Sequence, residues 1–303
     1  MTKEAHIVSS DTHSRSASAF FSDIKSLIKG PVLIANVLPV FAGFWLALYF
    51  SGMTLAGNWT MFWLTMIGST FLMAGALVMN NWYDSDIDTF MERTQQRPTV
   101  TGNFQLKTVL NIGMILSGIG MLLLLFTTFE AALYAFIGWF TYVIPYTMWS
   151  KRKYTLNTVI GSVSGAVTPL IGWAAIMPAN HIVPIVLFAI LFIWQMPHTF
   201  AIAMKKYDDY KAANVAMLPV VKGFDFTKRQ MLNYVLCLLP LPFLLPMFGT
   251  AFLVVATLMN LGYIGASIYG FYAKDNYRWA NVMFLYSVNY MTLLFAMMIL
   301  LTF

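Results

Sequence analysis

Three oxygen-bearing side chains, Asn80, Asp84 and Asp88, recur every four residues at the end of a long apolar segment. If the helix predicted there continues, they lie on adjacent turns of one face, drifting by about 40° per step. Asp86 points elsewhere, which argues against a simple acidic surface patch. Mg²⁺ commonly binds through one or two carboxylates and shares its other sites with water and substrate phosphates. The spacing therefore predicts a catalytic Mg²⁺ site in an enzyme that handles a diphosphate at a membrane surface.

Two other interpretations of this array are a solvated helix end and a calcium-binding loop. At a bare helix end, three carboxylates within Asp84–Asp88 would repel one another unless a cation joined them. The alternation of acids imitates the start of an EF-hand. However, Thr89 stands where the turn glycine belongs, and Gln95 stands where the bidentate glutamate belongs. The calcium loop is therefore excluded.

Cationic side chains that could bind a diphosphate follow the acids along the chain. Arg93 and Arg97 are about one helical turn apart, as a bidentate phosphate clamp would require. Lys151 and Arg152 end a later apolar segment, beneath Tyr146. Anchoring at the membrane surface is the alternative role for all four cations. Only proximity to the acids would make them ligands.

A second polar array lies inside and just after another apolar segment. Gln195 and His198 are within that segment, where polar groups are costly and usually mark interior functional positions. For His198, the alternative is a histidine paired to a neighbouring carbonyl. Lys206, Asp208 and Asp209 follow. The two acids could complete a second metal site facing the first.

The composition is that of an integral membrane protein. Hydrophobic residues make up 59% of the chain, charged residues 10%, and the mean hydropathy is +0.70. Runs long enough to span a bilayer predict an all-α polytopic membrane protein with nine transmembrane helices, at 31–51, 61–80, 107–126, 129–148, 158–178, 182–204, 231–248, 250–272 and 280–303. In the fifth, the small residues Gly161, Gly165 and Gly172 predict close helix contact.

The positive charges give the expected topology. All of them fall before the first segment or in a loop after an even-numbered one, so the positive-inside rule places the amino terminus and those loops in the cytoplasm. They are Lys3, Arg15, Lys25, Lys29, Arg93, Arg97, Lys107, Lys151, Arg152, Lys153, Lys205, Lys206, Lys211, Lys222, Lys228, Arg229, Lys274 and Arg278. The net charge of +6 is thus a topology signal, and no nucleic-acid partner is expected.

The sequence predicts a short tail followed by a single domain. Residues 1–24 are expected to form a disordered cytoplasmic tail, which leaves 25–303 as a single nine-helix transmembrane domain. The chain has one cysteine, Cys237, so neither a disulfide framework nor a cysteine-type zinc site is expected. Two long loops, 81–106 and 205–230, are expected on the cytoplasmic side, and function should concentrate there.

Several motifs resemble a known family. The stretch Asn80–Asp88, followed by Met91-Glu92-Arg93-Thr94 and Arg97-Pro98, resembles the first motif of the UbiA-type intramembrane prenyltransferases. Trp194-Gln195-Met196-Pro197-His198 and Met217-Leu218-Pro219 resemble the subgroup of that family that farnesylates protoheme IX, the haem O synthases. The likeness runs from about residue 25 to residue 242.

A few positions depart from the pattern of the family, and none of them is a proposed ligand. Asn214 and Ala216 stand where glycine and proline are more usual, and Thr168 replaces the first of a usual proline pair. Gly30-Pro31 stands where Lys-Pro-Arg is frequent.

The resemblance implies a UbiA prenyltransferase-like fold around a central cavity that opens to lipid. It implies farnesyl diphosphate as donor, haem B as acceptor, haem O and diphosphate as products, and a plasma-membrane enzyme of haem-copper oxidase biogenesis, with haem A synthase or a second copy of the chain as candidate partners. Mg²⁺ would be the cofactor, bound by Asn80, Asp84, Asp88, Asp208 and Asp209. All of these except Asp208 are the expected catalytic residues, and the expected substrate-binding residues are Arg93, Arg97, Tyr146, Lys151, Arg152, Gln195, His198 and Lys206.

Two other functions are considered beside this one. A sister prenyltransferase acting on an aromatic quinone precursor would share the first motif, but would not account for His198 and Met217-Leu218-Pro219. A divalent-cation transporter would need acids buried at mid-membrane along a path. Here the acids lie at one predicted surface, beside cations that suit phosphate.

Overall fold

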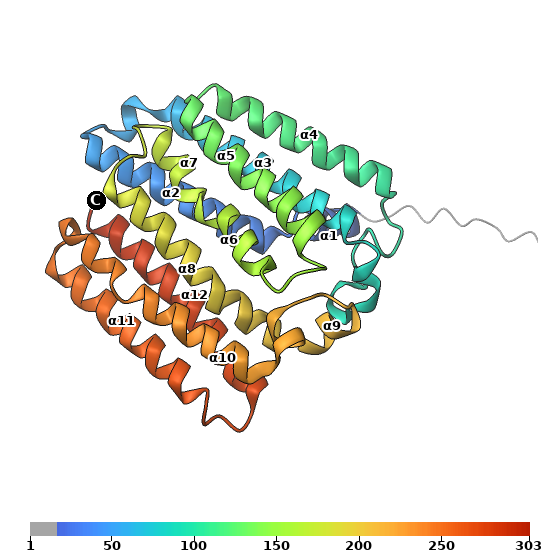
Figure 1. The fold of residues 1–303 in the computed structure, drawn as a ribbon. Coiled ribbons are helices and arrows are strands. Elements are labelled where there is room, and N and C mark those ends of the chain that lie inside the picture. Colours follow the sequence, from blue (N-terminus) through green and yellow to red (C-terminus); the bar gives the residue numbers. More distant parts are fainter. Residues whose placement is uncertain (1–16) are drawn as a thin grey trace, which may run out of the picture.

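The structure is a computed structural model that describes residues 17–303. This part of the chain is all helical and contains no strand, so the all-α prediction is confirmed (Figure 1). The α-helices are α1 (Ala17–Leu27), α2 (Gly30–Ser51), α3 (Trp59–Tyr83), α4 (Leu106–Leu125), α5 (Phe129–Thr141), α6 (Asn157–Ala166), α7 (Thr168–Ala174), α8 (Ile182–Lys205), α9 (Tyr207–Ala212), α10 (Leu218–Leu238), α11 (Gly249–Tyr269) and α12 (Asn276–Leu300). Short turns are η1 (Leu55–Gly57), η2 (Ile87–Phe90), η3 (Glu92–Thr94), η5 (Leu241–Leu244) and η6 (Pro246–Phe248), and η4 (Tyr142–Ser150) is a π-helix.

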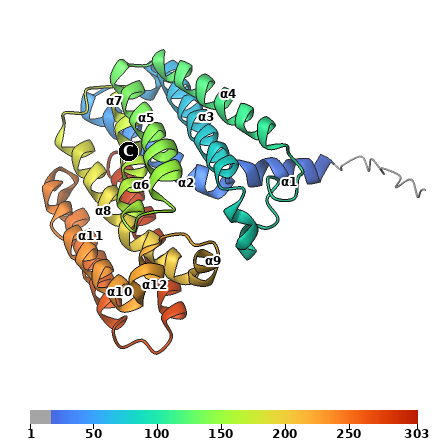
Figure 2. The same ribbon diagram turned by 45° about the vertical axis from the view of Figure 1, so that its right-hand side comes forward.

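The long helices run side by side, while α1, α9 and the segment after α3 gather at one end of the bundle (Figures 1 and 2). Seven helical segments of the described part are long and apolar enough to cross a membrane. They are α2, α3, α4, α5 with η4, α8, η6 with α11, and α12. Each of the nine predicted spans overlaps a helix, so the count of nine holds approximately. The bounds of two spans differ from the prediction.

The fifth predicted span, 158–178, is broken in two. Helix α6 ends at Ala166, and α7 begins at Thr168 with Pro169 in its first turn. Proline has no backbone N–H and clashes with the preceding turn, which ends one helix and suits the start of the next. The span is therefore two short helices in series.

The second of the two long loops that the sequence predicted, 205–230, is largely helical in the structure. It contains α9 and the first half of α10, which has a break at Gly223, where φ is 79°. The charges at Lys222, Asp225, Lys228 and Arg229 hid this helix from a reading based on hydropathy. At its other end α10 stops at Leu238, short of the predicted residue 248, because prolines follow at positions 240 and 242.

The boundary predicted between tail and domain falls inside a helix. Residues 1–16 of the predicted tail lie outside the described residues, whereas 17–24 belong to α1. Apolar side chains recur at helical spacing, at Phe20, Ile24 and Leu27. Leu27 is buried with Val78 and Val109, which fixes α1 against α3 and α4. A Ser-rich composition concealed this pattern.

Small residues bring α6 and α7 close to their neighbours, as the glycine spacing predicted. A Cβ added at Gly172 would lie 1.9 Å from the carbonyl oxygen of Val40 in α2. A Cβ at Gly165 would lie 1.7 Å from the amide nitrogen of Gln195 in α8. Such backbone approach is typical of membrane helix packing. It places the broken span between α2 and α8.

Candidate active site

The acidic array lies at the carboxyl end of α3, where the chain continues in helix-like turns. The amide of Asp84 donates to the carbonyl of Asn80, and the amide of Asp88 donates to that of Asp84, both at 2.9 Å. Asn80, Asp84 and Asp88 therefore share one face and are all buried, at 2%, 0% and 1% exposure. Asp86 is exposed, as predicted.

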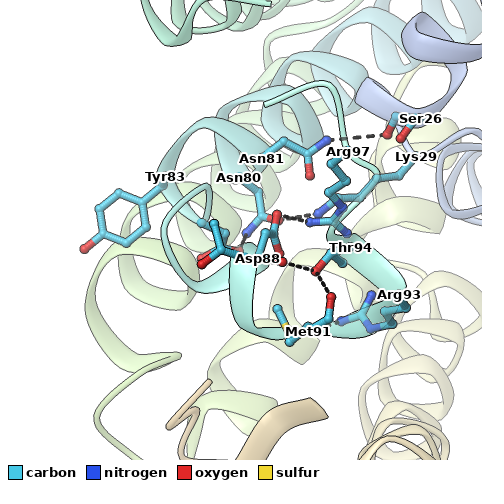
Figure 3. A network of polar contacts seen from close by, with 12 residues as sticks. Ser26, Lys29, Asn80, Asn81, Tyr83, Asp88, Met91, Arg93, Thr94 and Arg97 are labelled. Carbon is cyan, nitrogen blue, oxygen red and sulfur yellow. Dashed lines mark hydrogen bonds and ion pairs between the residues drawn. The ribbon is translucent and has the colours of Figure 1, made fainter. Parts of the chain in front are cut away.

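Each of the three buried side chains is contacted by a cation from a different element. Lys29, which precedes α2, donates to Asn80 Oδ1, and Lys151, which follows η4, donates to Asp84 Oδ2. Arg97 Nη1 lies 2.5 Å from Asp88 Oδ2. Figure 3 shows Lys29, Asn80, Asp88 and Arg97 pointing toward one another. We call these six residues the acid–base cluster: Lys29, Asn80, Asp84, Asp88, Arg97 and Lys151.

Burial acts to lower the pKa of both lysines, but the charges beside them differ. Burial lowers the pKa of Lys29, and the neighbouring charges of Arg97 and Lys151 lower it further. Burial also acts to lower the pKa of Lys151, but its contact with the Asp84 carboxylate outweighs this and raises the pKa. The cluster thus stabilises the charged form of Lys151, whereas burial and the neighbouring cations disfavour the charged form of Lys29.

Arg152 lies beside the cluster and holds its outer acid. Its guanidinium makes two 2.7 Å hydrogen bonds to Asp86 and one of 2.8 Å to the carbonyl of Tyr83. The hydrogen bond from Arg152 lowers the pKa of the Asp86 carboxyl. Arg152 is 3.7 Å from Asp84 Oδ1 and 4.8 Å from the ring centre of Tyr83. Tyr83 itself points away from the cluster (Figure 3).

One oxygen of the cluster fits a metal ion. Asp84 Oδ1 is buried and has no hydrogen-bond partner among the described residues. A carboxylate oxygen with a free lone pair is the ligand that Mg²⁺ prefers. Within residues 17–303, this cluster included, no group of three or more His, Cys, Asp or Glu side chains stands close enough together to hold a metal. The cations now occupy other cluster oxygens.

The two acids of the second array, Asp208 and Asp209, have different partners. Asp209 Oδ1 accepts from the backbone amide of Glu92 at 3.1 Å, and its Oδ2 lies 3.9 Å from Arg93 Nε. Helix α9 therefore meets the Glu92-Arg93 part of the first motif. Asp208 is exposed, and its carboxylate accepts from the hydroxyl of Tyr277 in α12 at 3.2 Å. The structure thus brings Asp209 toward the first motif and turns Asp208 away from it. Lys206, the third predicted residue of this segment, is exposed.

Tyr146 lies in the π-helical segment η4, which contains Pro145. Single π-helical turns are frequent at functional sites. The ring of Tyr146 lies 2.8 Å from where a Cβ at Gly161 would be, so the glycine makes room for it. The same segment supplies Thr147, whose hydroxyl accepts from Asn80 Nδ2 at 3.0 Å. Segment η4 thus borders the cluster on one side.

The polar residues of α8 face two different helices. Gln195 packs against Gly165 of α6, as the close glycine contact requires. His198 Nδ1 lies 2.7 Å from Ser287 Oγ of α12. The ring of His198 stacks on Trp194, with centroids 4.5 Å apart. Within the described part of the chain, neither Gln195 nor His198 forms a hydrogen bond or ion pair with a member of the acid–base cluster.

A comparison with protein families identifies the fold and its relatives. The model of the UbiA prenyltransferase family matches residues 36–288. The chain belongs to this family. With its apolar helices, membership makes it a multi-pass membrane protein.

Relatives of high identity carry one name. The chain is 54% identical over 281 residues to a protoheme IX farnesyltransferase of Oceanobacillus iheyensis, covering 92% of this chain and 90% of that protein. It is 51% identical over 282 residues to a protoheme IX farnesyltransferase of Bacillus mycoides, covering 93% and 92%.

Solved structures of other members have the same fold. A structure concerning digeranylgeranylglyceryl phosphate synthase matches with a TM-score of 0.73 at 20% identity, covering 93% of this chain and 98% of that one. A UbiA homologue from Archaeoglobus fulgidus bound to DMAPP and Mg²⁺ matches with a TM-score of 0.69 at 15% identity, covering 91% and 99%. The family fold implied by the sequence resemblance is therefore confirmed.

Two cluster contacts were missed by the sequence analysis. Lys29 was treated only as a topological charge, and Thr147 was not singled out. Lys29 adopts a left-handed conformation, with φ 49°, just before Gly30-Pro31. The position of this cation, directly before the first apolar span, was the available signal. Thr147 has no signal in the sequence, because only the π-helical register turns its hydroxyl toward Asn80.

Proposed function

We propose that the chain transfers the farnesyl group of farnesyl diphosphate to a vinyl group of haem B, giving haem O and diphosphate. The observation that carries the acceptor and product is the 54% identity, over 92% of the chain, to a protein named protoheme IX farnesyltransferase. The acid–base cluster supports the donor, because it combines buried carboxylates with cations suited to a diphosphate. The enzyme would act in the plasma membrane, with its amino terminus and the cluster on the cytoplasmic side.

The cluster residues would divide the work of ionising the donor. Mg²⁺, held by Asn80, Asp84, Asp88 and Asp209, would supply positive charge next to the leaving diphosphate. Asp84 Oδ1, which is buried and accepts no hydrogen bond from a described residue, is the oxygen best prepared for this role. Asp208 was proposed as a further ligand. It would have to leave Tyr277 first.

The cations would take the phosphate oxygens. Arg97 presents a planar fork that can bind two oxygens at once, whereas Lys151 acts as a point charge. Lys29 joins them as a third cation, which the sequence analysis did not propose. Arg93 and Lys206 lie nearer α9, and Arg152 is committed to Asp86. We assign Arg152 to holding the end of α3 and binding the substrate at its edge.

The covalent step follows from the charge that the donor releases. Loss of diphosphate leaves an allylic farnesyl cation, and the haem vinyl group supplies the electron pair for the new C–C bond. Positive charge then moves to the carbon beside the pyrrole ring. Water adds there and loses a proton, which leaves a hydroxyl group on haem O. Apolar and aromatic walls, Tyr146 among them, would keep water from the cation before that bond forms.

Other functions have less support in the geometry. A divalent-cation transporter would place unpaired acids along a path through the membrane. Here the acids lie at the end of α3, and each is already paired with a cation or an amide. A quinone-precursor prenyltransferase remains the alternative within the family. Haem A synthase or a second copy of the chain stay proposed partners.

The direct test is a reaction of the purified protein. It would be incubated with farnesyl diphosphate, Mg²⁺ and haem B, and the haem would be analysed by mass spectrometry. We expect haem O together with one diphosphate released per haem consumed. Asp209→Asn should lower turnover far more than Asp208→Asn, since only Asp209 contacts the first motif. Product from an aromatic quinone precursor, and none from haem B, would overturn the proposal.

A further inference from the structure

Four side chains of α8 and α12 form a strip away from the acid–base cluster. Trp194, His198 and Lys205 lie on one face of α8, because steps of four and seven residues return within about 40° of the same direction. Phe284 of α12 contacts this face. Each of the four side chains is partly exposed. We call them the α8–α12 strip; it borders space that a ligand or lipid can reach.

The hydrogen bonds of Ser287 fix the tautomer of His198. The hydroxyl of Ser287 donates its single hydrogen to the carbonyl of Phe284, at 2.6 Å. For its 2.7 Å contact with His198 Nδ1 to be a hydrogen bond at the same time, the imidazole has to be the donor. A neutral imidazole carries one N–H, so Nε2 keeps a bare lone pair. That atom can accept a proton or bind a metal, and it cannot donate a hydrogen bond.

The same serine holds the orientation of the ring. Trp194 stacks on His198 at 4.5 Å, and the indole nitrogen of Trp194 donates to the carbonyl of Ser287 at 2.8 Å. Phe284 lies on the imidazole at 5.3 Å. A histidine that bonds through one nitrogen to a neighbour has the arrangement of a metal-ligating imidazole, whose partner fixes tautomer and direction. Ser287 is therefore a positioning residue.

Lys205 supplies an unpaired charge at the end of the strip. Its ammonium lies 4.3 Å from the ring centre of Phe284 and forms no ion pair with a described carboxylate. By contrast, Lys151 and Arg97 each hold an acid. Lys205 comes seven residues after His198, which is about 10.5 Å along the helix. It is the last residue of α8, where a helix would leave the membrane.

We infer that the α8–α12 strip binds haem B, with His198 Nε2 at the iron and Lys205 at a haem carboxylate. The inference rests on the proposed function for its ligand. A histidine can bind haem as a ligand of the iron or as a hydrogen-bond donor to a haem carboxylate, and the tautomer of His198 decides between these two roles. Because Nε2 carries no proton, His198 binds the iron, and the carboxylate is left to the ammonium. The charged edge of haem then lies at the end of α8, near water, and its macrocycle lies against Trp194 and Phe284. Neutral imidazole is a common axial ligand of haem iron.

The test is a haem titration followed by the Soret band, using haem B and its dimethyl ester. Lys205→Gln should weaken binding of haem B about tenfold, the scale of a hydrogen bond to a charged group. It should leave the affinity for the ester unchanged, because the ester has no carboxylate. Lys222→Gln, an exposed lysine of α10, is the matched control and should bind both ligands as the wild type does. Equal losses for both ligands in Lys205→Gln would overturn the carboxylate assignment.

The imidazole is tested on the same titration. His198→Ala should shift the Soret band of the bound haem. Ser287→Ala should weaken haem binding about tenfold, the lower end of the range for losing a residue that orients a metal ligand. Ser287→Thr, which keeps the hydroxyl, should restore it. An unshifted Soret band in His198→Ala, or equal weakening by alanine and threonine at position 287, would refute the iron assignment.

Failure of this inference differs from failure of the proposed function. If the wild type makes haem O while the Lys205 and His198 variants bind haem normally, haem occupies another site and the assignment of the α8–α12 strip is refuted. If the variants behave as expected but the wild type makes no haem O, the strip is a haem site and the proposed reaction is wrong. Farnesyl diphosphate binding should be unchanged in Lys205→Gln and His198→Ala in either case.

Discussion

Replacing Asp84 by asparagine tests the acid–base cluster most sharply. Asp84 is fully buried, receives a hydrogen bond from Lys151 and lies 3.7 Å from Arg152. Asparagine keeps the shape and removes the charge. It leaves the Lys151 side chain, only 13% exposed, without its counter-ion. Breaking a buried pair on one side costs about 3–5 kcal/mol, so the variant should unfold at a lower temperature in detergent.

The effect on catalysis should be separable from this loss of stability. Removing one group that stabilises charge in the transition state lowers kcat by about 10² to 10³. The double variant Asp84→Asn with Lys151→Met removes both charges and should regain most of the stability, because no unpaired ion remains. We expect it to stay inactive. The assay is haem O formation by mass spectrometry beside a thermal unfolding curve for each variant.

The control is Asp86→Asn, in the same motif. The Asp86 side chain is 64% exposed and pairs with Arg152, and exposed ion pairs contribute little. Turnover should change by less than about threefold. Near-normal turnover in the double variant would refute the role of Asp84 as a ligand. If Asp86→Asn lowered turnover as much as Asp84→Asn does, the reaction would require the net negative charge of the motif and no particular carboxylate.

Three further changes probe single features. Arg97→Lys keeps the charge but loses the planar fork, so KM for farnesyl diphosphate should rise about tenfold with a smaller change in kcat; an unchanged KM would reduce Arg97 to a partner of the acids. The hydrogen bond from Arg152 lowers the pKa of Asp86 below 3.8. Its stabilisation is therefore present above pH 3.8 and lost as the pH falls below it, and the difference in thermal midpoint between wild type and Asp86→Asn should vanish there; a difference that grows on acidification would contradict this. Gly172→Ala should destabilise by about 1–3 kcal/mol, because its methyl would meet backbone of α2 at 1.9 Å. Gly118→Ala, with nothing within 4 Å, is the control, and equal unfolding midpoints for the two would contradict the packing argument.

The fold could be predicted wherever apolar length alone decides the structure. Spans such as α3 and α8 were found within a few residues of their ends because nothing polar interrupts them. Helix α10 was found only in its second half, since Lys222, Asp225 and Arg229 made its first half look like a loop. Hydropathy measures transfer into lipid, and an exposed amphipathic helix end gives no such signal.

The first motif could be predicted because its geometry is local. Asn80, Asp84 and Asp88 are spaced by four, and one helical period places them together in any fold that keeps the helix. Among the cations of the cluster, only Arg97 lies close enough to these residues along the sequence to be assigned to them by proximity. Lys29 reaches Asn80 from 51 residues away, and Lys151 reaches Asp84 from 67 residues away. Those contacts depend on how α2 and η4 pack against α3, which the sequence does not state.

Asp208 and Asp209 mark the limit of sequence reasoning most clearly. They are neighbours of the same type, and both are about 120 residues from the first motif. On a helix, adjacent side chains point about 100° apart, so only one of them can face a given partner. The rotation of α9 turns Asp209 to Glu92 and Arg93, and Asp208 to Tyr277. That rotation is set by the turns on either side, which include Asn214 with φ 50°. The family resemblance implies glycine at this position, and asparagine tolerates a left-handed conformation better than other residues with a side chain. The departure from the family pattern is thus compatible with the turn that presents Asp209 to the first motif.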